Sequence, residues 1–376
     1  MSGPQTAMLA DGRRLHLNHG PIDLVIEAYG TEPERRAAYG QATARFRTIL
    51  DELVAELPEL RRPASTLPRG FDGPTARRME AAVVPHAETF ITPMAAVAGS
   101  VADEILAAMV AERSLDKAYV NNGGDIALHL ASGSGIHAAI AGTGHGLADR
   151  LAIDAASPVR GIATSGWPGR SFSLGIADAV TVLARSAAEA DAAATMIANA
   201  VDLAGHAAVT RTPANVLQPD SDLGARLVTQ GVGLLSPGEI ALALETGLAV
   251  AEDLARRQLI VAAALFLKGE SRVAGVLPGL QVSSRCSPAA GPPPLAVVPQ
   301  PPAVPPPLTP PHKGEGDSET LTPPSPLWGG VRGGGNPTQN RANNPTRDTL
   351  DKPLRDRPGR DHPDDRRPIP EHVSHA

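Results

Sequence analysis

The sequence has little cysteine, few aromatic residues and no long hydrophobic run. Its one cysteine among 376 residues, Cys286, excludes an intrachain disulfide and a thiolate metal cluster. The longest uninterrupted apolar run, Leu259 to Leu267, is far shorter than the roughly 20 residues of a membrane span. The first twenty residues contain no apolar segment typical of a secretion signal. We therefore expect a soluble cytoplasmic protein without a membrane partner.

An excess of positive charge is also missing. Residues 1–280 carry 23 Lys and Arg against 30 Asp and Glu. A negatively charged surface is a poor partner for a phosphate backbone, so we expect no nucleic-acid binding.

Proline is abundant, but it is unevenly distributed. Of 37 prolines, 22 lie in residues 287–376, which hold only 13 residues of the V, I, L, M, F, W, Y, C group. So few apolar side chains cannot offset the chain entropy lost on folding. We predict one folded domain over residues 1–280 and a disordered, Pro/Gly-rich low-complexity tail over 281–376. The tail could be a proline-rich ligand, but its repetitive sequence favours translated repetitive DNA.

The N-terminal part alternates hairpin and helix signals. Short-period apolar alternation predicts strands over Arg13–Leu17 and Ile22–Ala28, around the turn-forming residues His19-Gly20-Pro21. Three- and four-residue apolar spacing predicts helices over Glu34–Leu57, Ala76–Val84 and Met94–Glu112.

The middle of the sequence changes to short strands separated by glycine. We predict strands over Ala118–Asn121, Ile126–Leu130, Ile136–Ala141, Val159–Ala163 and Ala179–Leu183. Helices over Ala187–Val201 and Pro237–Arg257 and a final strand over Leu259–Leu267 follow. Because strands and helices are grouped rather than strictly alternating, the pattern favours an α+β fold of layered sheet and helices over a doubly wound sheet.

The first candidate site is the segment Asn121-Asn122-Gly123-Gly124-Asp125. Glycines let a ligand approach the backbone and expose amide donors to anionic oxygens, and the adjacent Asp125 can accept a hydrogen bond. An ordinary strand connection has the same residues, so the segment alone decides nothing.

The second candidate is Thr164-Ser165-Gly166, at the end of a predicted strand. Its hydroxyls and free amides suit a phosphate, and a turn with side-chain-to-backbone bonds is the alternative.

The third candidate is Asp191 with Thr195 on a predicted helix. Spacing of i, i+4 places the carboxylate and the hydroxyl on one helix face. Hard oxygen ligands in this arrangement can hold part of a Mg²⁺ shell. A solvated or capping Asp and a Thr bonded to its own helix form the alternative.

Three histidines recur at eight-residue intervals, His129, His137 and His145. If residues 132–135 form a tight hairpin, Leu130 faces His137 and His129 points to the opposite side of the sheet. We therefore expect no shared metal at these histidines.

In order and spacing the three candidate segments resemble the motifs of the ApbE superfamily, the FAD:protein FMN transferases. These have a Gly-Gly-Asp turn, an Ala-Thr-Ser-Gly segment and an Ala-Asp-x-x-x-Thr helix. The stretch from about His19 to about Gly275 is most similar to an uncharacterised branch of this superfamily, through segments such as Thr92-Pro93-Met94-Ala95.

The resemblance implies an ApbE-like fold, an FAD ligand or substrate, and Mg²⁺ held by Asp191 and Thr195. It further implies that a nucleotide site is lined by Asn121, Gly123, Gly124, Asp125, Thr164, Ser165 and Gly166, and that FMN passes to a protein acceptor. The oligomeric state does not follow from it.

Two departures from the transferase pattern concern catalysis and location. The transferases usually have a His-x-x-Asp-Pro-x-x-Gly stretch near the reacting phosphate, whereas residues 167–182 here contain no histidine; Arg170, Ser171, Ser173 and Asp178 lie in this interval. Many bacterial transferases are exported or lipid-anchored, and no such signal occurs here. We can name no general base, so three hypotheses stay open: a Mg²⁺-dependent flavin transferase-like or pyrophosphate-cleaving enzyme, a non-catalytic ligand-binding protein on the same fold, or an enzyme of another cofactor pathway.

Overall fold

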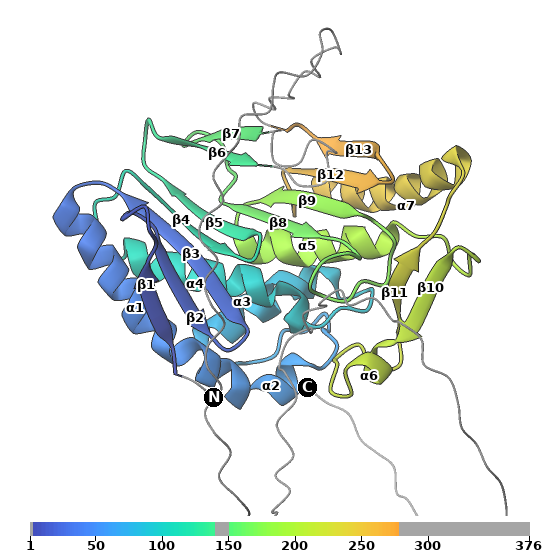
Figure 1. Cartoon of the computed structure of the whole chain (residues 1–376), viewed down its shortest axis with the longest axis horizontal. Helices are drawn as coiled ribbons and strands as arrows, with labels where there is room; N and C mark the ends of the chain where they lie inside the picture. The colour runs from blue at the N-terminus through green and yellow to red at the C-terminus, as the bar shows by residue number, and fades with distance from the viewer. Residues whose placement is uncertain (1–2, 140–149, 278–376) are drawn as a thin grey trace, which may run out of the picture. The chain divides into compact units, whose positions relative to one another are not determined.

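A computed structural model describes residues 3–139 and 150–277, all of which belong to one compact unit. A nine-stranded sheet dominates it, in the order β1-β2-β3-β4-β5-β8-β9-β12-β13, and the paired strands run antiparallel (Figure 1). The predicted α+β class is confirmed. The predicted tail, 281–376, lies outside the described residues, as do Cys286 and His145.

The strands are short, as the glycine spacing of the sequence predicts. Those of the large sheet are β1 Gln5–Met8, β2 Leu15–His19, β3 Ile22–Tyr29, β4 Lys117–Asn122, β5 Asp125–Leu130, β8 Gly161–Ser165, β9 Ala179–Ala184, β12 Ala262–Leu267 and β13 Glu270–Gly275. Two further hairpins pair β6 Gly135–Ala139 with β7 Arg150–Asp154, and β10 Val209–Pro213 with β11 Leu227–Val232.

The five longer helices lie close to their predicted positions, and the two four-residue helices, Leu57–Leu60 and Ala214–Leu217, are not predicted. They are α1 Glu32–Ala55, α2 Leu57–Leu60, α3 Pro74–Val83, α4 Val97–Val110, α5 Ala187–Ala200, α6 Ala214–Leu217 and α7 Pro237–Arg256. The predicted helix Met94–Glu112 begins as a 3₁₀ turn, Pro93–Ala96, and continues as α4. The strands β1, β10, β11 and β13, which have no clear apolar period, are not predicted, and neither is β7, in which Leu151 and Ile153 alternate as buried residues.

The N-terminal hairpin is confirmed. His19 pairs with Ile22 across the turn, and Gly20 has φ +57°, a left-handed conformation that favours glycine.

Helices cover one face of the sheet in two blocks. In the first, α1 and α4 pack on β2 to β5 around Phe46, Leu24 and Ile105. In the second, α5 and α7 pack on β8, β9 and β12 around Val182 and Leu265. The β6–β7 hairpin packs on the opposite face, which explains why every residue of β9 and β12 is buried.

The predicted hairpin between the strands before and after residues 132–135 is wrong. β5 pairs with β4 and β8, while β6 leaves the large sheet and pairs with β7. His129 therefore lies opposite Ala118, and His137 lies opposite Ala152. The position of β8 beside β5, set by a later segment of the chain, decides this pairing. Within residues 3–139 and 150–277, no group of three His, Cys, Asp or Glu side chains is placed to hold a metal ion.

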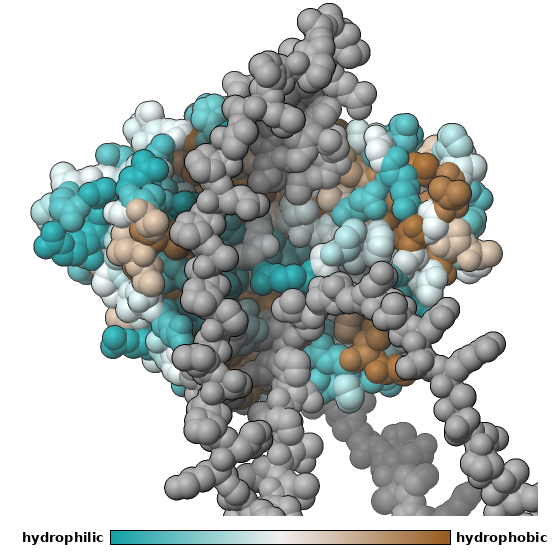
Figure 2. All heavy atoms as spheres, viewed as in Figure 1, coloured by the Kyte–Doolittle hydropathy of each residue, from teal (hydrophilic) through white to brown (hydrophobic). Residues whose placement is uncertain are grey.

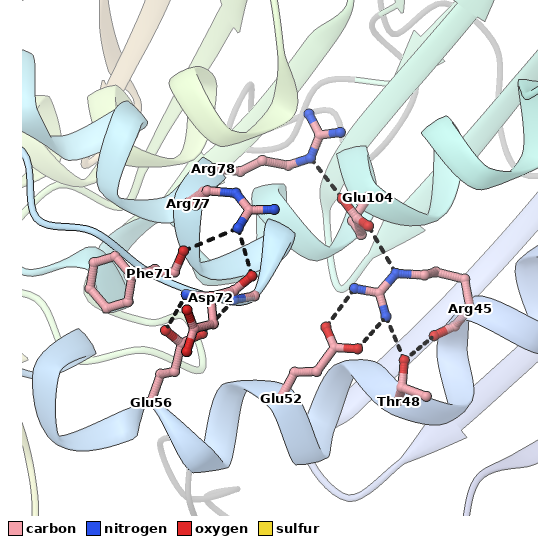
Figure 3. A network of polar contacts seen from close by, with 10 residues as sticks. Arg45, Thr48, Glu52, Glu56, Phe71, Asp72, Arg77, Arg78 and Glu104 are labelled. Carbon is pink, nitrogen blue, oxygen red and sulfur yellow. Dashed lines mark hydrogen bonds and ion pairs between the residues drawn. The ribbon is translucent and has the colours of Figure 1, made fainter.

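A network of ion pairs joins three helices under the sheet (Figure 3). Glu104 of α4 accepts hydrogen bonds from Arg45 of α1 at 2.8 Å and from Arg78 of α3 at 2.9 Å. Arg45 also binds Glu52 with both terminal nitrogens. Since Glu104 is only 11% exposed, losing one partner would leave a poorly solvated charge.

One apolar stretch among the described residues, Pro93–Val110, is long and apolar enough to cross a membrane by length and composition alone. Half of it is buried in the domain, where Val101, Ile105 and Met109 contact α1 and the sheet. Exposed apolar side chains occur elsewhere, on α6, β11 and α7, including Val216, Leu227 and Leu242; hydrophobic surface is visible in that part of Figure 2.

Candidate functional site

A pocket of about 380 Å³ lies where segments far apart in sequence meet. It is bounded by the β4–β5 turn, the end of β8 with the loop that follows it, the start of α4, one face of α5, and the loop between α6 and β11. Its polar lining consists of Arg61, Thr92, Asp125, Thr164, Ser165, Arg170, Ser171, Asp191, Thr195, Asn199, Gln218, Asp220, Ser221 and Asp222.

Seven of the nine sequence-predicted site residues line this pocket: Gly123, Asp125, Thr164, Ser165, Gly166, Asp191 and Thr195. Asn121 and Gly124 do not. Their predicted ligand contacts stay a prediction; Asn121 lies in β4 and Gly124 in the β4–β5 turn.

The Gly-Gly turn needs both glycines for its backbone. Gly123 has φ +66° and Gly124 φ +120°, and the Gly124 N–H donates to Asn121 Oδ1 at 2.9 Å. That amide is therefore already engaged within the turn. The turn sets the direction of Asp125, the first residue of β5.

The end of β8 is tied to its neighbours. Thr164 N–H donates to Asp125 Oδ1 at 3.3 Å, and the Thr164 hydroxyl lies 2.9 Å from the Thr181 hydroxyl of β9. Position 166 requires glycine, because a Cβ there would lie 2.5 Å from the Asp178 carbonyl oxygen. The strand end is thus fixed beside Asp125.

Helix α5 is positioned by contacts at its first turn. The carboxylate of Asp103, on α4, accepts hydrogen bonds from Ala187 N–H at 3.0 Å and Ala188 N–H at 2.9 Å. Gly99 packs so closely on this turn that a Cβ there would lie 2.2 Å from the Ala187 carbonyl oxygen. The Gly99 N–H in turn donates to Asp191 Oδ2 at 2.9 Å. Two helices thereby hold the Asp191 carboxylate at the pocket, with Thr195 one turn further along.

Two carboxylates from different elements share this pocket. Burial raises the pKa of Asp125 above its usual value, and hydrogen bonding from Thr164 and the charge of Arg170 oppose this rise. Burial raises the pKa of Asp191 as well, and the negative charges of Asp125 and Asp103 raise it further. The charge of each carboxylate therefore disfavours the charged form of the other.

One wall of the pocket, formed by residues 218–223, is not predicted from the sequence. The loop of residues 218–223 brings Asp220, Ser221 and Asp222 to the pocket, where Asp220 pairs with Arg61 at 2.8 Å and Asp222 accepts from the Thr92 hydroxyl. Burial raises the pKa of Asp222. The Asp-Ser-Asp run was the available signal, but it lies in a segment without clear periodicity. Of the loop residues considered after the Thr-Ser-Gly segment, Arg170 and Ser171 line the pocket, while Ser173 and Asp178 make contacts within the scaffold.

A sequence model of the family described as "AbpE bacteria" matches residues 6–273, which include all helices, the whole pocket and all of the sheet except the outer ends of β1 and β13. The chain belongs to this family. The predicted resemblance is confirmed by that match and by a UPF0280 protein of Methanopyrus kandleri, which is 36% identical over 180 residues, covering 47% of this chain and 69% of that one.

A second relative of this family member is a UPF0280 protein of Methanothrix thermoacetophila, 39% identical over 165 residues, with 41% of this chain and 65% of that one covered. The aligned parts thus span about two thirds of these relatives.

Two solved structures also align with this family member. They are the flavin transferase ApbE of Vibrio cholerae, with 12% identity, a TM-score of 0.39 and coverage of 72% of this chain and 97% of that one, and a flavinyl transferase ApbE of Pseudomonas stutzeri, with 14% identity, a TM-score of 0.35 and coverage of 72% and 95%. At these scores the alignments add nothing to the family assignment.

Proposed function

We propose that this protein binds a flavin nucleotide or a similar phosphate-bearing ligand together with Mg²⁺. One observation carries the proposal: Asp125 and Asp191, which come from separate elements, line one pocket beside the Thr195 hydroxyl. Repulsion between two such carboxylates persists only where burial and the surrounding contacts hold them in place, and a divalent cation relieves it.

The donor set fits the proposed metal. Two carboxylates and a hydroxyl are hard oxygen ligands of the kind that Mg²⁺ and Mn²⁺ prefer, and the lining residues within 3–139 and 150–277 include no Cys or His to favour a softer metal. Asp125, Asp191 and Thr195 would hold the ion. Its chemical contribution would be to neutralise charge on a bound pyrophosphate.

The remainder of the lining suits a nucleotide. The volume lies within the range of small-molecule sites, which are mostly apolar with a few placed polar groups. Phe90, Phe172 and Met94 provide apolar surface for a ring system, while Thr164 and Ser165 lie beside the carboxylates.

Binding has more support than turnover. Of the described residues, no histidine lines the pocket, and the loop where the transferases usually have one places Arg170 there instead. A non-catalytic binding protein on the same fold is therefore the second candidate, and it predicts nucleotide affinity without product. An enzyme acting on another cofactor would show a metal site that depends on Asp191 but no flavin affinity. The cytoplasmic location and a protein acceptor stay predictions.

Calorimetric titration of FAD into the full chain, with and without Mg²⁺, tests the proposal. We expect binding that requires Mg²⁺, is lost in Asp191→Asn, and is retained in Asp51→Asn, which changes an exposed aspartate of α1. Mass analysis of the same mixtures for FMN and AMP separates an enzyme from a binder. Absence of FAD binding in both conditions would reject the flavin part of the proposal.

A further inference from the structure

Among the described residues, Arg170 is a cation of the pocket lining that forms no ion pair within 4.0 Å. The lining contains two cationic side chains, Arg61 and Arg170. Arg61 forms an ion pair with Asp220 at 2.8 Å. Within residues 3–139 and 150–277, Arg170 has neither a hydrogen bond nor an ion pair within 4.0 Å, so its guanidinium donors are available to a ligand.

The loop that carries Arg170 is anchored at its base. Trp167 N–H donates to the Ala177 carbonyl at 3.0 Å, and the indole N–H donates to Asp178 Oδ1 at 3.3 Å. Gly169 N–H closes a turn on the Gly166 carbonyl at 3.1 Å. Arg170 follows this turn directly, so its backbone starts from a fixed point.

The guanidinium lies against the Gly-Gly turn. A Cβ built on Gly123 would be 1.5 Å from Arg170 Nη2 and 2.7 Å from Cζ, so only glycine leaves room for this contact. The charge of Arg170 acts on Asp125 from this position and opposes the rise of its pKa. Arg170 therefore lies near Asp125 without forming an ion pair with it.

The charge balance of the pocket then decides what binds. Without metal, Asp125 and Asp191 repel an anion. A divalent cation on the pair would offset their two charges, and Arg170 would then be the cation at the Gly123 turn that attracts an anionic group, while Asp222 stays a carboxylate of the separate wall formed by residues 218–223. A planar guanidinium presents paired donors that match phosphate oxygens.

We propose that Arg170 binds a phosphate group of the ligand above the Gly123 turn, next to the metal held by Asp125 and Asp191. The inference rests on the proposed function and adds the residue that selects phosphate esters or diphosphates over uncharged ring compounds. It makes Arg170 a ligand-binding residue in the loop where the related transferases usually have histidine.

The test compares four probes on the full chain by calorimetry: Mg²⁺ alone, and FAD, inorganic pyrophosphate and riboflavin in constant excess Mg²⁺. In Arg170→Ala we expect the affinities for FAD and pyrophosphate to fall about tenfold to a hundredfold, the range for a charged hydrogen bond. Riboflavin, which has no phosphate, should bind equally to both proteins. Mg²⁺ alone should bind at least as tightly, because a positive charge beside Asp125 is removed.

Two further variants separate charge, geometry and general damage. The affinities of Arg170→Lys for FAD and pyrophosphate should fall between those of wild type and Arg170→Ala, since lysine keeps the charge but lacks the paired donors of the guanidinium. Arg185→Ala, which removes another exposed arginine outside the pocket, should bind all probes as wild type does. Melting temperatures show that each variant is folded.

The outcomes distinguish this inference from the proposed function. Mg²⁺-dependent FAD binding that is unchanged in Arg170→Ala would overturn the role of Arg170 and leave the function standing. Pyrophosphate binding that depends on Arg170, without FAD affinity, would support the phosphate site and reject the flavin ligand. A wild-type protein that binds neither probe would overturn both.

Discussion

Asp125 and Asp191 are costly to keep charged in the absence of a cation. Each has a pKa raised chiefly by burial, and the charge of Asp125 raises the pKa of Asp191 further. Hydrogen bonds from Thr164 N–H and Gly99 N–H stabilise the charged forms only in part. For an acid whose folded pKa is raised, stability is lost as pH rises through the interval between its unfolded and folded pKa values.

We therefore expect Asp125→Asn and Asp191→Asn to stabilise the metal-free protein at about pH 8, by roughly 1 kcal/mol or a few degrees in melting temperature. Added Mg²⁺ should raise the melting temperature of the wild type and of Asp51→Asn, but not that of the two pocket variants. Thermal denaturation with and without Mg²⁺ measures both effects. Equal Mg²⁺ responses in all four proteins would place the ion elsewhere.

His86 gives a pH dependence of the opposite sign. Burial, with a smaller contribution from the charge of Arg257, lowers its pKa from 6.5 to about 4. The neutral ring is therefore retained in the folded state while the unfolded chain takes up a proton below about pH 6.5. Stability from this residue is fully present above that pH and is lost as pH falls toward 4.

Chemical denaturation of wild type and His86→Leu at about pH 7 and about pH 5 tests this. The wild type should lose about 2 kcal/mol relative to the variant between the two conditions. Other titrating groups are common to both proteins. A difference in unfolding free energy between the two that does not change with pH would therefore show that His86 takes up its proton equally in the folded and unfolded states.

At the scale of elements, the site depends on the close approach of α4 to the first turn of α5. Gly99 allows the approach, Asp103 caps the turn, and the alanines of α5 leave little bulk between the helix and the sheet. The position of Asp191 relative to Asp125 is thus set by helix packing and not by the loops around the pocket.

Gly99→Ala should force α4 and α5 apart. A Cβ 2.2 Å from the Ala187 carbonyl oxygen cannot be accommodated. We therefore expect the free energy of unfolding to fall by about 1–3 kcal/mol and Mg²⁺ binding to weaken. Gly40→Ala is the matched control, because that glycine lies in the interior of α1 with nothing within 4 Å of the added Cβ. The free energy of unfolding of Gly40→Ala should rise by about 0.5–1 kcal/mol. Denaturant melts of both variants measure the contrast, and similar values would contradict the packing argument.

At the scale of the whole molecule, every residue that lines the pocket lies between Arg61 and Leu223, and the last described strand ends at Gly275. The family match ends at residue 273. We therefore predict that residues 281–376 are not needed for the folded core or for the site.

We expect a protein truncated after residue 280 to keep the melting temperature and the ligand affinity of the full chain. The change in melting temperature should be within about 2 °C, less than the effect of 1 kcal/mol in a domain of this size. Differential scanning calorimetry and the FAD titration check this. Lost binding after truncation would assign the C-terminal segment a part in the site.

Local sequence patterns determined the α+β class, most helix positions and the first hairpin, because period 3.6, period 2 and turn residues act over a few neighbours. The three motifs predict Gly123, Asp125, Thr164 and Asp191 as site residues without reference to the fold. Each motif consists of small or polar residues whose chemistry is visible without the fold.

Only the tertiary structure decided which of these residues meet. The pairing of β5 with β8 brings Asp125 beside Thr164, and the capping of α5 by Asp103 brings Asp191 to the same pocket. The 218–223 wall and the contact of Arg170 with Gly123 join segments that no local period connects. Sequence patterns report nearest neighbours along the chain, whereas the repulsion of two carboxylates and the unpaired charge of Arg170 depend on distances that long-range packing sets.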